Sequence, residues 1–203
     1  MTDLNQRGQR NWRKLIGSFV IIIAILLMDQ VLKVWVKTHM SLYEEIPIFG
    51  NWFKLLFIEN DGMAFGWMGG GGIMKVFLSL FRIAAVIILI YILFRLTKKD
   101  VKFSLLVGIA LITAGALGNI IDCVFYSKIF HYGDGWLHGK VVDMLYFPII
   151  NISRENNSWL PGFLFGPDNR FIFFRPIFNI ADTSITIGVF YMVLFQWKWL
   201  KKI

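Results

Sequence analysis

Cysteine and cofactor-binding motifs are almost absent from this chain of 203 residues. Cys123 is the only cysteine, which excludes an internal disulfide and a metal site built from paired cysteines. The sequence also contains no His-Glu-x-x-His zinc motif and no Walker-type phosphate loop, and no serine is placed with a lysine or histidine base on a neighbouring apolar run. We therefore expect neither a metal nor a cofactor.

A cleavable signal sequence is missing as well. The first apolar run is too long for the hydrophobic region of a signal peptide, and no small-residue cleavage site follows it. We expect this run to remain as the first membrane span.

Apolar side chains, in contrast, are abundant. Hydrophobic residues make up 57% of the chain and aromatic residues 17%, and the mean hydropathy is +0.61. Because soluble domains are about 45–50% apolar, this composition predicts a small integral membrane protein. The net charge of +8 would suit a nucleic-acid partner, but the basic residues punctuate apolar runs and do not gather on a polar domain. Nucleic acid is therefore not an expected partner.

Four apolar runs approach the roughly 20 residues that a helix needs to cross a bilayer. They predict an all-α membrane protein, a single integral membrane domain over 1–203, with spans at about 15–36, 73–94, 103–122 and 181–197. The N-terminal tail, the loop after the second span and the C-terminal tail hold four, four and three basic residues. Positive charge favours the cytoplasmic side, so both termini should be cytoplasmic.

The two remaining segments, 38–72 and 123–178, should then be extracytoplasmic. Turn residues interrupt short apolar pieces in the first of them, such as residues 52–58, which favours short strands. A plain connecting loop is the alternative, but loops of about 35 residues are uncommon unless they bind something or fold on their own. We expect a small β-rich extramembrane piece there. The third span is rich in small residues and should pack in the interior of the bundle.

Two Asn-x-x-Asp motifs flank the last two spans. In Asn119–Asp122 and Asn179–Asp182, the amide and the carboxylate are three residues apart and share one helix face. A helix rises 1.5 Å per residue, which places three aspartates roughly 22–30 Å from the basic residues that border their spans. They are Asp29, Asp122 and Asp182. All three should share one layer near the outer boundary, where carboxylates are candidates for function.

Paired carboxylates support one chemistry in particular. Two of them close together share a proton, so one can activate water while the other protonates a carbonyl oxygen, as in aspartic peptidases. Asn119 and Asn179 would orient the carboxylates or the scissile backbone. The alternatives are structural: Asn179 could cap the fourth helix, with Asp182 stabilised by the helix dipole, and Asp29 could pair with Lys33 one turn away. Arg82, inside the second span, could reach the outer headgroups or meet an acid in the bundle.

Five motifs in order carry a resemblance to a known family. They are Asp29-Gln30-x-x-Lys33, Asn60-x-Gly62-x-Ala64-Phe65, Gly115-Ala116-Leu117-Gly118-Asn119-Ile120-Ile121-Asp122, Val141-Val142-Asp143 and Phe178-Asn179-Ile180-Ala181-Asp182-Thr183-Ser184. Together they are similar to the motifs of the bacterial lipoprotein signal peptidases (signal peptidase II).

This resemblance implies a monomeric enzyme of the bacterial cytoplasmic (inner) membrane whose active site lies near the extracytoplasmic face. It would remove signal peptides from diacylglyceryl-modified prolipoproteins, cleaving just before the lipidated cysteine, with membrane lipid as a second partner. Asp122 and Asp182 match the catalytic dyad, and Asp143 is assigned structural support. The supporting or substrate-binding positions would be Asp29, Lys33, Asn60, Gly62, Asn119, Asn179 and Ala181. The resemblance also implies an extramembrane β-cradle from 40 to 68 at the membrane surface and a lid-like stretch within 123–140.

The chain departs from the family at two places. The residue after the first dyad aspartate is usually arginine, and here it is Cys123, so the role of that arginine is lost or is taken over by Lys128, Lys140, Arg154, Arg170 or Arg175. The stretch from 146 to 176 is longer than usual, and it either covers the site, contacts substrate or is a surface insertion.

A small proton-coupled membrane transporter is the alternative function. Transporter sites usually lie near the midplane between repeats, whereas these acids are predicted at one face, so the peptidase is favoured. A magnesium-dependent lipid phosphotransferase would need several carboxylates with a basic clamp beside them.

Overall fold

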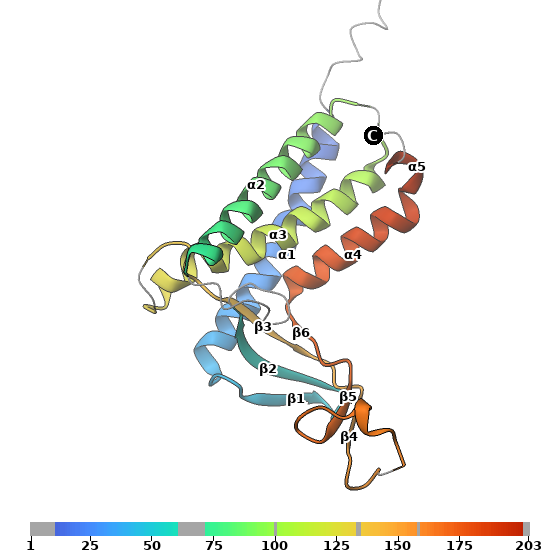
Figure 1. The fold of residues 1–203 in the computed structure, drawn as a ribbon. Helices are drawn as coiled ribbons and strands as arrows, with labels where there is room; N and C mark the ends of the chain where they lie inside the picture. The colour runs from blue at the N-terminus through green and yellow to red at the C-terminus, as the bar shows by residue number, and fades with distance from the viewer. Residues whose placement is uncertain (1–10, 61–71, 100, 133–134, 158, 201–203) are drawn as a thin grey trace, which may run out of the picture. The chain divides into compact units, whose positions relative to one another are not determined.

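The computed structural model describes residues 11–60, 72–99, 101–132, 135–157 and 159–200 (Figure 1). The chain forms two compact units, which are described separately. A helical unit consists of Met1–Leu32, Asn60–Val141 and Ile180–Ile203, and a strand unit consists of Lys33–Glu59 and Val142–Asn179.

Helices occupy the predicted spans. They are α1 (Trp12–His39), α2 (Gly72–Leu96), α3 (Phe103–Ile129), α4 (Ile180–Phe195) and the short α5 (Trp197–Leu200). Among the described residues, α1, α3 and the part of α2 from Val76 are long and apolar enough to cross a membrane. Helix α4 is also apolar but has 16 residues, so the fourth crossing stays a prediction.

Helix α3 continues past its predicted end at residue 122. It runs about two turns further, to Ile129, because the intervening residues include neither glycine nor proline. The helix ends where His131 takes a positive φ of 55°. The lid-like stretch implied for 123–140 therefore begins as helix.

Three contacts place the basic flanks of the spans at one end of the helical unit. The backbone N–H of Asn11 donates to the carbonyl of Thr97 (2.9 Å), and Lys14 Nζ donates to the carbonyl of Val101 (2.6 Å). At the end of α4, Gln196 Nε2 donates to Ser104 Oγ (3.3 Å). The start of α1, the α2–α3 connection and the end of α4 therefore meet at the same end, as the charge argument requires.

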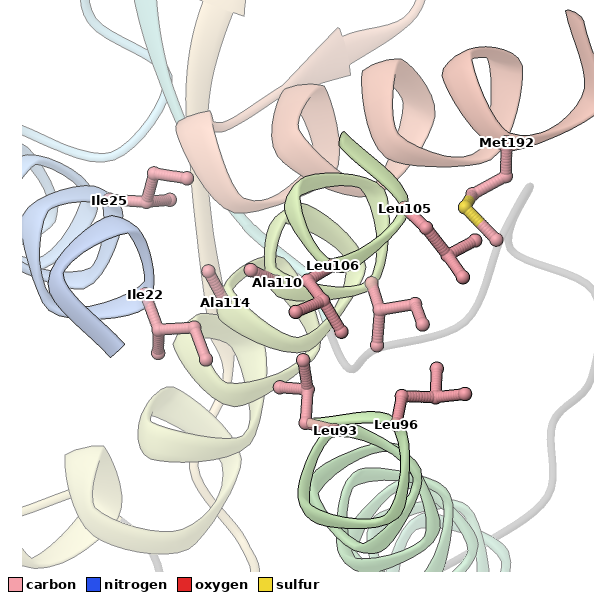
Figure 2. Close-up of a cluster of buried hydrophobic side chains, with 10 residues drawn as sticks. Ile22, Ile25, Leu93, Leu96, Leu105, Leu106, Ala110, Ala114 and Met192 are labelled. Atoms are coloured by element: carbon pink, nitrogen blue, oxygen red, sulfur yellow. The ribbon is translucent and has the colours of Figure 1, made fainter. Parts of the chain in front are cut away.

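Helix α3 is the central helix of the unit. Within its most apolar window 61% of the residues are buried, against 22% for α1 and 17% for α2. The buried side chains of α3 meet those of α1, α2 and α4 in one apolar cluster (Figure 2): Ile22, Ile25, Leu93, Leu96, Leu105, Leu106, Ile109, Ala110, Ala114 and Met192. The outward surface of the other helices is apolar and exposed, as at Ile23, Ile87 and Phe190, which suits contact with lipid.

Glycines let α4 approach α3 closely, which confirms the prediction that α3 is a packed helix with small residues at its contacts. A Cβ at Gly108 would lie 2.6 Å from Met192 Sδ, and a Cβ at Gly188 would lie 2.7 Å from Ile112 Cγ1. A Cβ at Gly115 would collide with the backbone carbonyl oxygen of Ala181. A larger residue at Gly115 would therefore have to move a helix, whereas at Gly108 and Gly188 the neighbouring side chains would have to shift.

Gly118→Ala should lower the melting temperature of the purified protein. The added Cβ would lie 2.7 Å from Asp29 Oδ2 and 3.0 Å from the Cβ of Ala181. Overpacking of this kind costs about 1–3 kcal/mol, so we expect a drop of several degrees in a thermal melt in detergent. Gly135→Ala is the matched control, since its nearest neighbour would be His138 Nδ1 at 3.9 Å. Equal melting temperatures for the two variants would contradict the packing argument.

The strand unit contains a four-stranded sheet of order β1-β2-β3-β6 and a separate hairpin, β4-β5. Strands β1 (Glu45–Phe49) and β2 (Phe53–Asn60) pair antiparallel, with Ile46 opposite Leu55. Strand β3 (Val141–Tyr146) pairs antiparallel with β6 (Ile177–Phe178). The strands expected between residues 38 and 60 are thus present, whereas residues 61–71 lie outside the described part.

The segment from 123 to 178, which was predicted to be extracytoplasmic, also forms strands, and the sequence did not reveal them. Five of the six residues of β3 are buried, so the alternation that marks a half-exposed strand is missing. The long stretch from 146 to 176 contains the strands β4 (Ile150–Ser153) and β5 (Arg170–Phe173), which pair as a hairpin. The short 3-10 helix η2 (Gly162–Leu164) lies between them. Its role stays a prediction.

Candidate active site

Asp182 lies in the first turn of α4 and is held by an asparagine of α3. Asn119 Nδ2 donates to Asp182 Oδ1 at 2.7 Å. This contact joins the two Asn-x-x-Asp motifs, because the amide of the first motif orients the carboxylate of the second. It is the orienting role that the sequence predicted for Asn119.

Asp29 connects α1 with the start of α4. Its Oδ1 accepts the backbone N–H of Ala181 at 2.8 Å, and its side chain is only 1% exposed. The first N–H groups of a helix have no partner within the helix, and the helix dipole favours a carboxylate there. Asp29 therefore caps α4 from another helix, a role that the sequence had suggested for Asn179.

Gln30 is a site residue that sequence reasoning quoted in a motif but did not single out. Its Nε2 donates to Asp122 Oδ1 (2.9 Å) and to Asp29 Oδ2 (3.1 Å), and also to the carbonyl of Gly118 (3.2 Å). Its Oε1 accepts the hydroxyl of Tyr126 at 3.1 Å. One amide thus bridges the carboxylates of α1 and α3. In the sequence, only its position next to Asp29 pointed to a role for Gln30 in the site.

Asp143 is held by the second motif asparagine, within the strand unit. Asn179 Nδ2 donates to Asp143 Oδ1 at 2.7 Å and to the carbonyl of Val142 at 3.3 Å, and both side chains are buried. The two motif asparagines therefore orient Asp182 and Asp143, whereas the amide on Asp122 comes from Gln30.

Tyr146 also belongs to the strand unit. Burial raises the pKa of its phenol, and the nearby negative charge of Glu45 raises this pKa further, so the phenol stays neutral.

The remaining predicted positions are spread over the chain. Lys33 is fully buried and belongs to the strand unit, Asn60 ends β2, and Ala181 contributes its backbone N–H. Gly62 lies outside the described residues. In the described part of the chain, no group of three or more histidine, cysteine or acidic side chains is arranged to hold a metal ion.

Comparisons with known proteins agree with the motifs. A family model described as signal peptidase (SPase) II matches residues 21–198. The lipoprotein signal peptidase of Porphyromonas gingivalis is 42% identical over 189 residues, covering 86% of this chain and 80% of the relative. That of Amoebophilus asiaticus is 37% identical over 190 residues, covering 90% and 78%.

Solved structures agree as well. Two structures, each described as a bacterial membrane enzyme, align with TM-scores of 0.60 and 0.58 at 26% and 28% identity. They cover 90% and 88% of this chain, which in turn covers 88% and 90% of theirs.

The apolar helices and these structural likenesses define a multi-pass membrane protein with the fold of a membrane enzyme. The chain belongs to the signal peptidase II family, whose members are proteases. Family membership favours the peptidase over the proton-coupled transporter.

Proposed function

We propose that this protein is a membrane-bound aspartic endopeptidase that removes signal peptides from diacylglyceryl-modified prolipoproteins, cleaving just before the lipidated cysteine. The match to the signal peptidase II family over residues 21–198 and the names of the relatives support the reaction. The observation that carries the site is the hydrogen bond from Asn119 to Asp182 at the start of α4. The proposal needs no cofactor.

In this mechanism two carboxylates share one proton. The ionised carboxylate takes a proton from water as the water oxygen attacks the scissile carbonyl, and the protonated one gives its proton to the carbonyl oxygen. The tetrahedral intermediate then collapses: the C–N bond breaks, the leaving amine takes a proton from the pair, and one hydroxyl of the intermediate returns its proton to the pair as the carbonyl re-forms. Asn119 supports this chemistry because its amide fixes one oxygen of Asp182 and so orients the carboxylate.

Asp182 is one member of the proposed pair, and two aspartates compete to be the second. The resemblance described in the sequence analysis predicted that Asp182 pairs with Asp122. A specific observation favours Asp143: the sequence predicted that Asn119 and Asn179 orient the carboxylates or the scissile backbone, and these two asparagines donate to Asp182 and Asp143. We therefore propose Asp143 as the partner of Asp182, and Asp122 as a structural carboxylate that the amide of Gln30 links to Asp29.

The proposed setting is the bacterial inner membrane, crossed four times, with both termini in the cytoplasm. The clustering of the basic flanks at one end of the helical unit supports this orientation. The carboxylates would then lie near the extracytoplasmic face, where a peptide bond beside a lipid anchor can reach them. Lys33, Asn60 and Gly62 are proposed to support the site or contact substrate, and the protein is proposed to act as a monomer within lipid.

The test compares a lipidated precursor with the same precursor lacking its diacylglyceryl group. The purified enzyme in detergent should cleave the lipidated precursor before the modified cysteine, with a chelator present, and should cleave the unlipidated one at least about 100-fold more slowly, since the lipid supplies binding energy that acts at the reacting bond. Mass spectrometry of the products gives the cleavage site. Equal cleavage of both precursors would contradict the proposed substrate class.

A further inference from the structure

Arg82 is a charged residue within α2, one of the apolar helices of the helical unit. It follows Ser79 by three residues and precedes Val86 by four, and both of these are buried, so the three residues lie on one inward-facing stripe of the helix. The adjacent Phe81, in contrast, is 65% exposed. Arg82 therefore points into the bundle and not toward lipid. Of the two roles that the sequence allowed, the inward one fits this position.

The guanidinium contacts α3 immediately beside the carboxylate layer. Arg82 Nη1 donates to Cys123 Sγ at 3.4 Å, and Cys123 is 1% exposed. Asp122 precedes Cys123 and is fully buried, and one residue along a helix is a rise of only 1.5 Å. The positive charge thus enters the bundle at the level of Asp122 and of the amide that bridges it to Asp29.

The guanidinium of Arg82 lies at the level of several acids. It carries a permanent positive charge and has five donors, of which the Cys123 sulfur accepts one. Burying several carboxylates together is costly, and a cation at their level lowers that cost. Asp29 and Asp122 are both almost fully buried in this unit, and Asp182 lies in it as well. A cation on α2 and acids on the facing helices stabilise each other.

We propose that Arg82 is a positioning residue of the active site, which supplies from α2 the positive charge beside Asp122 that position 123 does not carry. The inference rests on the proposed peptidase function. Sequence reasoning named five other basic residues as possible substitutes for an arginine at position 123. It missed Arg82 because the contact joins residues that are 41 positions apart.

Three variants distinguish an effect of the positive charge of Arg82 from an effect of the packing of its side chain. Arg82→Gln removes the charge, Arg82→Lys keeps it, and the double variant Arg82→Gln/Cys123→Arg moves it from α2 to α3. With a lipidated precursor, Arg82→Gln should lower kcat about 10-fold or more at nearly unchanged KM, because the charge acts on the carboxylates and not on substrate binding. Arg82→Lys and the double variant should each recover at least about half of the wild-type kcat, since each returns a cation to this level. Arg95→Gln, at the other end of α2, is the matched control and should leave kcat unchanged.

Two results would overturn the proposal. One is a wild-type kcat in Arg82→Gln. The other is a loss of kcat that neither Arg82→Lys nor the double variant repairs, since the role would then be one of shape and not of charge. A thermal melt of each variant normalises kcat to folded enzyme. Asp182→Asn is assayed in parallel to distinguish the two proposals. Activity in that variant would contradict the peptidase mechanism. An inactive Asp182→Asn together with a fully active Arg82→Gln would contradict only the role of Arg82.

Discussion

Replacing Asp182 by asparagine should reduce cleavage of a lipidated prolipoprotein by on the order of 1,000-fold or more, since the amide can neither take the proton from water nor return it. The substitution preserves size, and Asn119 keeps an acceptor, so the variant should fold. The measurement is the single-turnover cleavage rate in detergent micelles, with a chelator present, alongside a thermal melt.

Asp168→Asn serves as the matched control. This aspartate contacts Arg175 at 3.3 Å in the strand unit, and both side chains are 46% exposed. An exposed pair of this kind contributes little to stability, so both the activity and the melting temperature of the control should match the wild type. Substantial activity in Asp182→Asn, or strict dependence of the wild type on a divalent metal, would remove the aspartic mechanism.

The second large effect is expected at Asp143. Asp143→Asn should lose activity to the same extent as Asp182→Asn, because the amide can neither take nor give the proton that the pair shares. Its melting temperature should fall no further than that of Asp122→Asn, since both carboxylates are buried and each accepts a side-chain amide. The loss of activity per folded molecule therefore distinguishes a catalytic carboxylate from a structural one.

Asp122→Asn provides the comparison. Its carboxylate is fully buried and accepts the amide of Gln30, and disturbing a buried hydrogen bond of this kind costs about 1–3 kcal/mol. We therefore expect a melting temperature lowered by several degrees and, per folded molecule, a smaller loss of activity than in Asp143→Asn. The opposite pattern, with Asp122→Asn inactive at full stability and Asp143→Asn active, would restore the pair that the sequence suggested.

The sequence predicted well what depends on composition along the chain. Apolar runs located α1, α2 and α3, and small residues such as Gly108 and Gly115 marked α3 as the helix that its neighbours pack against. These features depend on side chains within one helix turn or one span, so they are visible without knowledge of the fold. The position of Asp182 in the first turn of a helix follows from the same local pattern.

The sequence did not reveal which hydrogen bonds form between distant segments of the chain. The amide of Asn119 could serve Asp122, one turn away on the same helix, yet it donates to Asp182 across 63 positions. Gln30 likewise reaches α3 across 92 positions. Which acceptor an amide takes depends on how the helices approach each other, and no local pattern records that. The strands between residues 123 and 178 were missed for a different reason, since β3 is buried on both faces and lacks alternation.

The hydrogen bond from Ala181 to Asp29 has a consequence for how the enzyme comes into being. Asp29 lies in the first helix to leave the ribosome, whereas Ala181 opens one of the last. Asp182 follows Ala181 directly, so its geometry is complete only after α4 has packed against α1. In the proposed mechanism the protease therefore gains its activity at the end of its own biogenesis, and a partly synthesised chain lacks the means to cut precursors.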